Sequence, residues 1–336
     1  MGHKIQFRNK ISKWSIAPFL SCRLSSIEDI WHAITLMPCE EWVYRGQYSK
    51  VWPLATSLEL SYGANKITRE SERNAIFDFM NKTRLYLNNG YSRIDALAAM
   101  QHYGAPTRLL DFTRSFFVAL YFAFETVGKT QHGKRTNAGK RANDHAVWAV
   151  NLKNALFNSR PLEEGINDNA CSMVAGVRSQ NLIEEELFRS AEQYIRDGMI
   201  INNAIRGEQC RKQAERLLLG ASEAHQLGIL PIDIIKSNPR MAAQNGLFIM
   251  TTDFRSFHDS LASAFGLQHF HPVNVKLSDI EKCFNIDDSL SVIKFIINDE
   301  LRYEVDKLLK AANIGTQTLF PDLSGIASQI KYDIVN

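Results

Sequence analysis

The sequence predicts an α+β fold, a mixed sheet of short strands with packed helices. Short segments rich in β-branched and aromatic residues, typical of strands, recur along the chain. Segments with apolar residues at helical spacing separate them, without the strict strand–helix alternation of a doubly wound sheet. With 336 residues and 45% apolar residues, the chain is large enough for an ordinary packed core.

The first predicted strand is the stretch "EEWVYRGQ", residues 40–47, which ends in a loop at Gly46. A helix is predicted within residues 65–87, where apolar residues recur at helical spacing. These are Ile76, Phe79, Met80 and Leu85. The charged residues between them indicate a solvated face.

Residues 94–101 are predicted to form a helix that stops near Gly104, because glycine favours the helix C-cap and Pro106 prevents continuation. Thr113 has the character of an N-cap residue for the segment that follows. That segment, residues 114–125, is apolar nearly all round and is predicted to be a core helix.

In the second half of the chain, predicted strands and predicted helices alternate less regularly. Further strands are predicted at residues 145–152, 246–251, 271–277 and 291–297. Helices are predicted over residues 184–197 and 208–220, and over 299–312 with Asn298 as the N-cap.

We predict that residues 41–336 form a single α+β domain and that residues 1–40 form an N-terminal extension, or a strand and helix that pack on the core. A polar stretch with five basic residues, at about 128–144, interrupts the domain. We interpret it as a flexible loop rather than a nucleic-acid patch, because it has no aromatic residue to stack on a base.

Composition excludes several classes of protein. A net charge of +3 does not by itself indicate nucleic-acid binding, and the five cysteines lack disulfide-framework or zinc-site spacing. The N-terminus lacks the apolar region of a signal peptide, and no apolar run reaches the roughly 20 residues that span a bilayer. We therefore expect a cytoplasmic protein without membrane contact.

Familiar catalytic motifs are missing from the sequence. It contains no GxxxxGK[ST], GxGxxG, HExxH or GxSxG pattern. Polar residues instead gather at the ends of predicted elements, at Arg45, in "QHYGAPTRLLDFT" (residues 101–113) and in "RMAAQNGLF" (residues 240–248). No metal site is expected among them.

Each of these residues has a functional and a structural interpretation. Arg45 suits a bidentate clamp on a phosphate or carboxylate, or a structural pair with Asp111. The backbone amides near Thr113 offer an anion site, although a threonine there is more often a cap. His102 is either an acid/base residue or a structural histidine. The amide of Gln244 can bind a ribose hydroxyl or base edge but cannot act as a general base.

Together the three segments resemble the FRG domain family, named for a Phe/Tyr-Arg-Gly motif. The motif stands here as Tyr44-Arg45-Gly46. The second block, QHYGxPTRLLDWT, stands as "QHYGAPTRLLDFT", with Phe112 where the family prefers tryptophan. A third pattern is present as Arg240, Gln244, Gly246 and Phe248, and a late block is matched in part by "NIGTQTLFPDL".

The layout of these blocks is similar to that of ADP-ribosyltransferases, which implies an ADP-ribosyltransferase-like core with NAD as substrate. The resemblance implies catalytic roles for Arg45, Asp111, Thr113 and Gln244. It implies NAD contacts for Arg45, Gly46, Gln101, His102, Tyr103, Thr107 and Arg108. Gln244 carries no charge and cannot act as a base. Either another acid stabilises the cationic sugar, or the nucleophile reacts without activation by a base, as a nucleobase nitrogen can.

The resemblance further implies a bacterial toxin or phage-defence role, with RNA, DNA or protein as the acceptor and an antitoxin or operon partner. The alternative is a non-catalytic module in which the same residues hold a nucleotide or nucleic acid.

Overall fold

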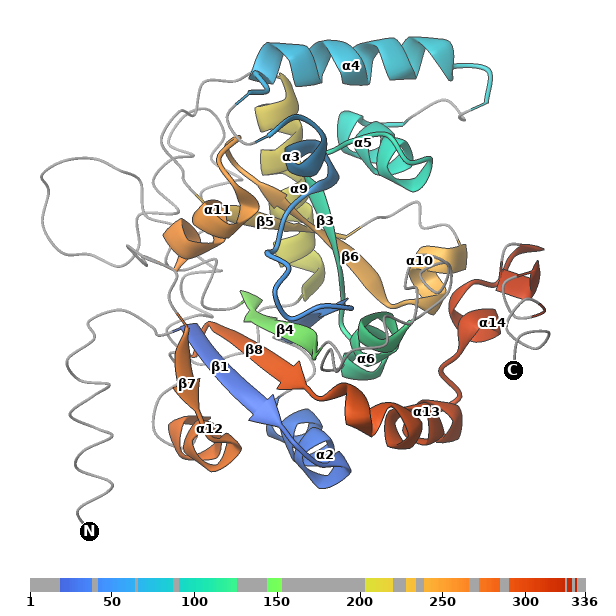
Figure 1. Ribbon diagram of the computed structural model, residues 1–336. Coiled ribbons are helices and arrows are strands. Elements are labelled where there is room, and N and C mark those ends of the chain that lie inside the picture. Colours follow the sequence, from blue (N-terminus) through green and yellow to red (C-terminus); the bar gives the residue numbers. More distant parts are fainter. Residues whose placement is uncertain are drawn as a thin grey trace, which may run out of the picture.

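The computed structural model describes residues 19–37, 42–63, 66–86, 91–125, 144–152, 203–219, 228–233, 239–265, 272–284, 290–323, 325–327 and 330. Within them one eight-stranded sheet has the order β5-β6-β3-β2-β4-β8-β1-β7 (Figure 1). Strand β1 pairs in parallel with β7 and β8, and the other neighbours are antiparallel. This mixed sheet with its packed helices confirms the predicted α+β class.

The strands are β1 (Phe19–Leu24), β2 (Trp42–Gln47), β3 (Leu109–Thr113), β4 (His145–Asn151), β5 (Ile229–Ile232), β6 (Gly246–Thr251), β7 (Val273–Val275) and β8 (Val292–Ile297). The helices are α2 (Ile27–Leu36), α3 (Ser57–Tyr62), α4 (Arg69–Lys82), α5 (Arg93–His102), α6 (Phe116–Phe124), α9 (Asn203–Leu219), α10 (Pro239–Ala243), α11 (Phe257–Ala264), α12 (Leu277–Phe284), α13 (Arg302–Ala311) and α14 (Thr316–Leu319), with a 3₁₀ turn at Asp299–Leu301.

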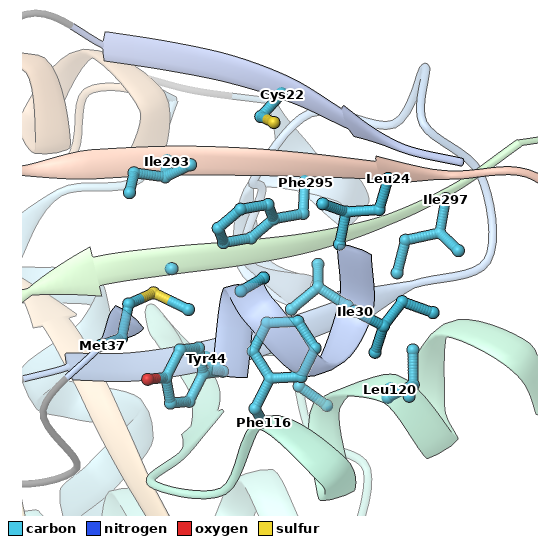
Figure 2. Close-up of a cluster of buried hydrophobic side chains, with 14 of the residues drawn as sticks. Cys22, Leu24, Ile30, Met37, Tyr44, Phe116, Leu120, Ile293, Phe295 and Ile297 are labelled. Atoms are coloured by element: carbon cyan, nitrogen blue, oxygen red, sulfur yellow. The ribbon is translucent and has the colours of Figure 1, made fainter. Parts of the chain in front are cut away.

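Three clusters of buried side chains form the core. The first lies between strands β1, β2, β4 and β8 and helices α2, α6 and α13; Figure 2 shows Tyr44, Phe116 and Phe295 meeting there. The second packs α11 on β3, β4 and β6. The third joins α4, α5 and α9 to β3, β5 and β6. In the part of the chain that the structure describes, no helix is long and apolar enough to cross a membrane.

Most predicted elements are confirmed. Strands β2, β4, β6, β7 and β8 lie within the predicted ranges, and α5 ends next to Gly104, whose φ of +83° is the left-handed value that glycine favours. Asn298 accepts a hydrogen bond from the Glu300 amide, as expected of an N-cap. The predicted helix at 184–197 and residues 128–143 of the predicted basic loop lie outside the described residues.

Two predictions are wrong. Thr113 is the last residue of β3, and Ser115 is the N-cap of α6, where its hydroxyl accepts from the Val118 amide. Either residue has the side chain of a cap, but the β3–β6 ladder includes Thr113, so the helix begins only after Ser115. Leu85 follows the end of α4 and is 94% exposed, so it is not part of that helix's apolar face.

Helix α6 packs unusually closely on β2. A Cβ atom at Gly46 would lie 1.8 Å from the carbonyl oxygen of Ala119 and 2.6 Å from the amide nitrogen of Ala123. Both alanines are fully buried. Glycine in the strand and alanine in the helix therefore allow backbone to meet backbone, and the neighbouring Tyr44 packs on Phe116 at 5.4 Å between ring centroids.

A buried histidine joins the start of β4 to the start of α13. His145 Nε2 lies 2.7 Å from Asp299 Oδ1, and Arg302 donates to the same oxygen at 2.7 Å. Burial lowers the pKa of His145, although Asp299 opposes this effect. Burial alone would raise the pKa of Asp299, but hydrogen bonds from His145 and Arg302 outweigh it and hold that pKa below its ordinary value.

The first prediction concerns Gly46. We expect Gly46→Ala to lower the free energy of unfolding by about 3 kcal/mol or more, because the new methyl group meets backbone atoms that cannot rotate away. Urea unfolding measures this change. Gly315→Ala, where a Cβ meets nothing within 4 Å, is the control and should cost less than about 1 kcal/mol. Equal losses for the two variants would show that the packing at Gly46 has no special importance.

The second prediction concerns pH. A histidine whose folded-state pKa lies below its unfolded value of 6.5 binds fewer protons in the folded state, so stability is lost as pH falls below 6.5. We expect His145 to account for about 1 kcal/mol of the loss between pH 7.5 and 5.5. Urea unfolding of His145→Gln should show a shallower pH slope than the parent.

The exposed His102→Gln variant is the control for the substitution itself. A remaining slope in His145→Gln is expected from His258, whose pKa is also lowered by burial. An unchanged slope in His145→Gln would contradict the prediction.

Candidate functional site

Arg45 and Asp111 form the centre of the candidate site. Arg45 Nη1 donates to the backbone carbonyl of Asp111 at 2.7 Å and lies 3.7 Å from its carboxylate oxygen Oδ2. The two side chains are 26% and 55% exposed. The structural pair considered from the sequence is therefore present, and both side chains remain partly exposed.

The local strand geometry explains why Arg45 turns to Asp111. Within the described residues, β2 and β3 pair at Tyr44 and Thr113 alone. The guanidinium bond to the Asp111 carbonyl provides a second tie between the two strands, next to that pair. It satisfies a carbonyl that would otherwise need another partner.

Gln101, at the end of α5, connects this pair to a second layer of polar groups. Its Nε2 donates to Asp111 Oδ2 at 3.2 Å, and its Oε1 accepts from the Thr107 hydroxyl. Ser57 Oγ accepts from the Thr107 amide at 3.0 Å. We call Arg45, Asp111, Gln101, Thr107 and Ser57 the Arg45–Asp111 network.

Sequence reasoning indicated four members of this network and missed Ser57. No sequence motif marks Ser57, which starts α3 and reaches Thr107 only through the fold. Burial lowers the pKa of Arg45 and Asp111 opposes that effect, but a guanidinium stays charged at neutral pH. Among the described groups, the buried Arg45 Nε has no hydrogen-bond partner.

Thr113 and Gln244 meet at the neighbouring edge of β3 and β6. The Thr113 hydroxyl donates to the Gln244 carbonyl at 2.7 Å and accepts from the Ser115 amide at 3.0 Å. Gln244 Nε2 donates to the carbonyl of Leu319 at 3.1 Å. Thr113 and Asp111 are two residues apart on β3 and therefore share a face of the sheet.

The structure thus brings the three polar segments of the sequence to three adjacent strands, β2, β3 and β6. Asp111 contacts both Arg45 and Gln101, whereas Thr113 and Gln244 form a separate contact that ties α6, β6 and α14 together. Gly46 faces α6. His102 and the 75% exposed Tyr103 follow Gln101 at the end of α5, with ring centroids 5.0 Å apart.

Arg108 is not part of the Arg45–Asp111 network. It forms a buried ion pair with Glu72 at 2.8 Å, donates to the Thr251 carbonyl at 3.1 Å and lies 4.7 Å from the Phe254 ring centroid. It lines a different pocket, together with Thr56, Glu59, Asp253, Phe254 and Arg255. Burial raises the pKa of Glu72, although Arg108 opposes this effect.

No group of three or more histidine, cysteine, aspartate or glutamate side chains suited to a metal ion occurs in the described part of the chain. The charged groups that the Arg45–Asp111 network offers to a ligand are one cation and one carboxylate.

Comparison with known proteins identifies one family. A model of the FRG domain matches residues 40–132, a segment that contains the whole Arg45–Asp111 network and leaves out Gln244. No curated protein and no solved structure matches the chain.

The third prediction tests the place of Arg108. We expect Arg108→Met to lower the free energy of unfolding by about 3–5 kcal/mol, because it leaves the Glu72 carboxylate buried without its partner. The double variant Glu72→Leu/Arg108→Met should lose less than the single variant, since it removes both charges. An Arg108→Met protein of parental stability that fails to bind NAD would instead make Arg108 a ligand residue.

Proposed function

The chain carries an FRG domain, and we propose that its Arg45–Asp111 network binds NAD and transfers ADP-ribose to a macromolecular acceptor, RNA or DNA before protein. The observation that supports this most is the partly exposed pair of Arg45 and Asp111, which come from segments 66 residues apart. Gln101 donates a hydrogen bond to Asp111 and orients its carboxylate. The proposed setting is a bacterial toxin or phage-defence system with an operon partner.

Arg45 is the proposed partner of the NAD pyrophosphate. A guanidinium binds phosphate oxygens through two parallel hydrogen bonds, and the pyrophosphate carries two negative charges, compared with one on the carboxylate 3.7 Å away. Nη1 keeps its bond to the Asp111 carbonyl while the remaining donors turn to the ligand. Binding therefore leaves the tie between β2 and β3 in place.

Asp111 is the proposed carboxylate of the reaction. Cleavage of the nicotinamide–ribose bond produces positive charge on the sugar, which a nearby anion stabilises. Gln244 carries no charge, and its amide donates to Leu319. The Asp111 carboxylate is more than half exposed and oriented by Gln101, so it can lie next to the developing cation without a large conformational change.

The alternative is a binding module that holds a nucleotide without chemistry. The observation that favours it is that the side chains of Thr113 and Gln244 both donate to backbone carbonyls. Fewer side chains are then available for catalysis than the resemblance implies. Both functions use Arg45 for phosphate, and they differ in whether Asp111 promotes turnover.

The fourth prediction separates these functions. The protein is incubated with labelled NAD and total RNA, DNA and lysate protein, and transfer and free nicotinamide are measured. We expect Asp111→Asn to bind NAD but to lower turnover by about 100-fold or more, and Arg45→Ala to weaken NAD binding at least tenfold. Asp78→Asn and Arg73→Ala, exposed changes on α4, are the matched controls.

NAD binding without turnover by the folded parent would establish the binding module. No binding at all by the folded parent would overturn both functions. If Arg45→Ala melts several degrees below the parent and no ligand measurement changes, the role of Arg45 is only to tie β2 to β3.

A further inference from the structure

Two cations contact a single carboxylate, and a third cation lies beside them on the sheet face that carries Arg45. Arg23 from β1 and Lys50 from the loop after β2 contact Asp144 Oδ2 at 2.8 Å and 2.7 Å. Lys294 from β8 donates to the backbone carbonyl of Lys50 at 2.6 Å. We call Arg23, Lys50, Lys294 and Asp144 the Asp144 cation cluster; three positive charges and one negative charge leave an excess of two.

The geometry of the cluster leaves its positive groups accessible. Arg23 and Lys50 are 48% and 38% exposed, while Asp144 is only 13% exposed. Burial lowers the pKa of Lys294, and the nearby Lys50 lowers it further, as expected where like charges are held together. The carboxylate lies beneath the cations, so an approaching ligand meets positive charge first.

Aromatic side chains lie in the same loop as Lys50. Trp52 is 45% exposed and its ring lies 6.3 Å from that of Tyr48, measured between centroids. A cation and a half-exposed indole two residues apart present the two surfaces that single-stranded nucleic acids use, a phosphate contact and a face for base stacking.

The strand register relates this cluster to the candidate site. Arg45 on β2 pairs with Trp148 on β4, which pairs with Lys294 on β8. Residues directly opposite one another share a face of the sheet, so Arg45 and Lys294 lie two strands apart on one face, about 10 Å between their backbones. Lys294 Nζ also lies 4.5 Å from the centroid of the Trp148 ring.

We propose that the Asp144 cation cluster and Trp52 form a binding surface for single-stranded nucleic acid, with phosphates on Arg23 and Lys50 and a base on Trp52. Because the cations come from three segments, the surface suits successive phosphates of a strand better than one small anion. The inference of a binding surface follows from these contacts and does not depend on any catalytic activity. Its role in presenting the acceptor to Arg45 and Asp111 rests on the proposed function.

The fifth prediction tests this surface with a fluorescein-labelled single-stranded RNA of about 20 nucleotides and mixed sequence, titrated at several KCl concentrations. We expect Arg23→Ala/Lys50→Ala to weaken binding at least tenfold and to reduce the salt slope by about 1.4, since each phosphate contact on a single strand contributes about 0.7. Trp52→Ala should weaken binding about tenfold, with the salt slope unchanged. Lys310→Ala, at an exposed lysine on α13, is the matched control.

Thermal melts establish that each variant is folded, and Lys50→Gln, which keeps the length of the stem, repeats the measurement if Lys50→Ala is unstable. No binding by the parent at low salt, or parental affinity in the double variant, would overturn the surface. Tighter binding to a duplex of the same length, with no effect of Trp52→Ala, would overturn the stacking contact and with it the preference for single strands.

The same variants separate this inference from the proposed function. Arg23→Ala/Lys50→Ala should bind NAD as the parent does, and Arg45→Ala should bind the RNA as the parent does. Failure of RNA binding with intact NAD turnover therefore rejects the surface alone. Failure of NAD binding with intact RNA binding rejects the proposed function alone.

Discussion

The close contact between α6 and β2 at Gly46 is the constraint on which the site depends. Ala119 and Ala123 approach the strand so closely that any side chain at position 46 would displace the helix backbone. With the helix fixed, Tyr44 packs on Phe116 and pairs with Thr113, and the intervening Arg45 is directed to Asp111. The three residues of the Tyr-Arg-Gly motif therefore have different roles. Tyr44 packs on Phe116, Gly46 allows the close approach of α6, and Arg45 carries the polar group that can contact a ligand.

The sequence predicts the strands that are rich in good β-formers, and these include β2, β4, β6 and β8. It does not predict β3, because Asp111 interrupts a short apolar run and Thr113 before an apolar helix has the character of a cap. Pairing with β6 along five residues overrides both local signals. Strand β5 is missed for a similar reason, since Pro231 lowers the strand propensity of a segment that the sheet edge nevertheless accepts.

The site is predictable in part. Polar residues at element ends indicate Arg45, Asp111, Gln101 and Thr107, and the structure brings these four together. Arg108 is likewise a polar residue at the end of an element. Its partner Glu72 lies on a helix 36 residues earlier in the chain, so only the packing of α4 reveals the pair. Spacing in the sequence shows which residues can carry chemistry, whereas burial decides which of them remain available.

Strand β4 lies between Arg45 of the candidate site and Lys294 of the Asp144 cation cluster. Its Trp148 lies between Arg45 and Lys294 in the register, donates to Gln47 at 2.8 Å and stacks on Phe19. Two strand spacings separate the backbones of Arg45 and Lys294, and because Coulomb repulsion falls with distance, the repulsion between their charges is weak. Each region also contains a carboxylate of its own, Asp111 or Asp144. Trp148 is buried, and its packing in the core fixes the spacing of the strands that carry Arg45 and Lys294. That spacing would set the distance between a nucleic acid held by one region and NAD held by the other.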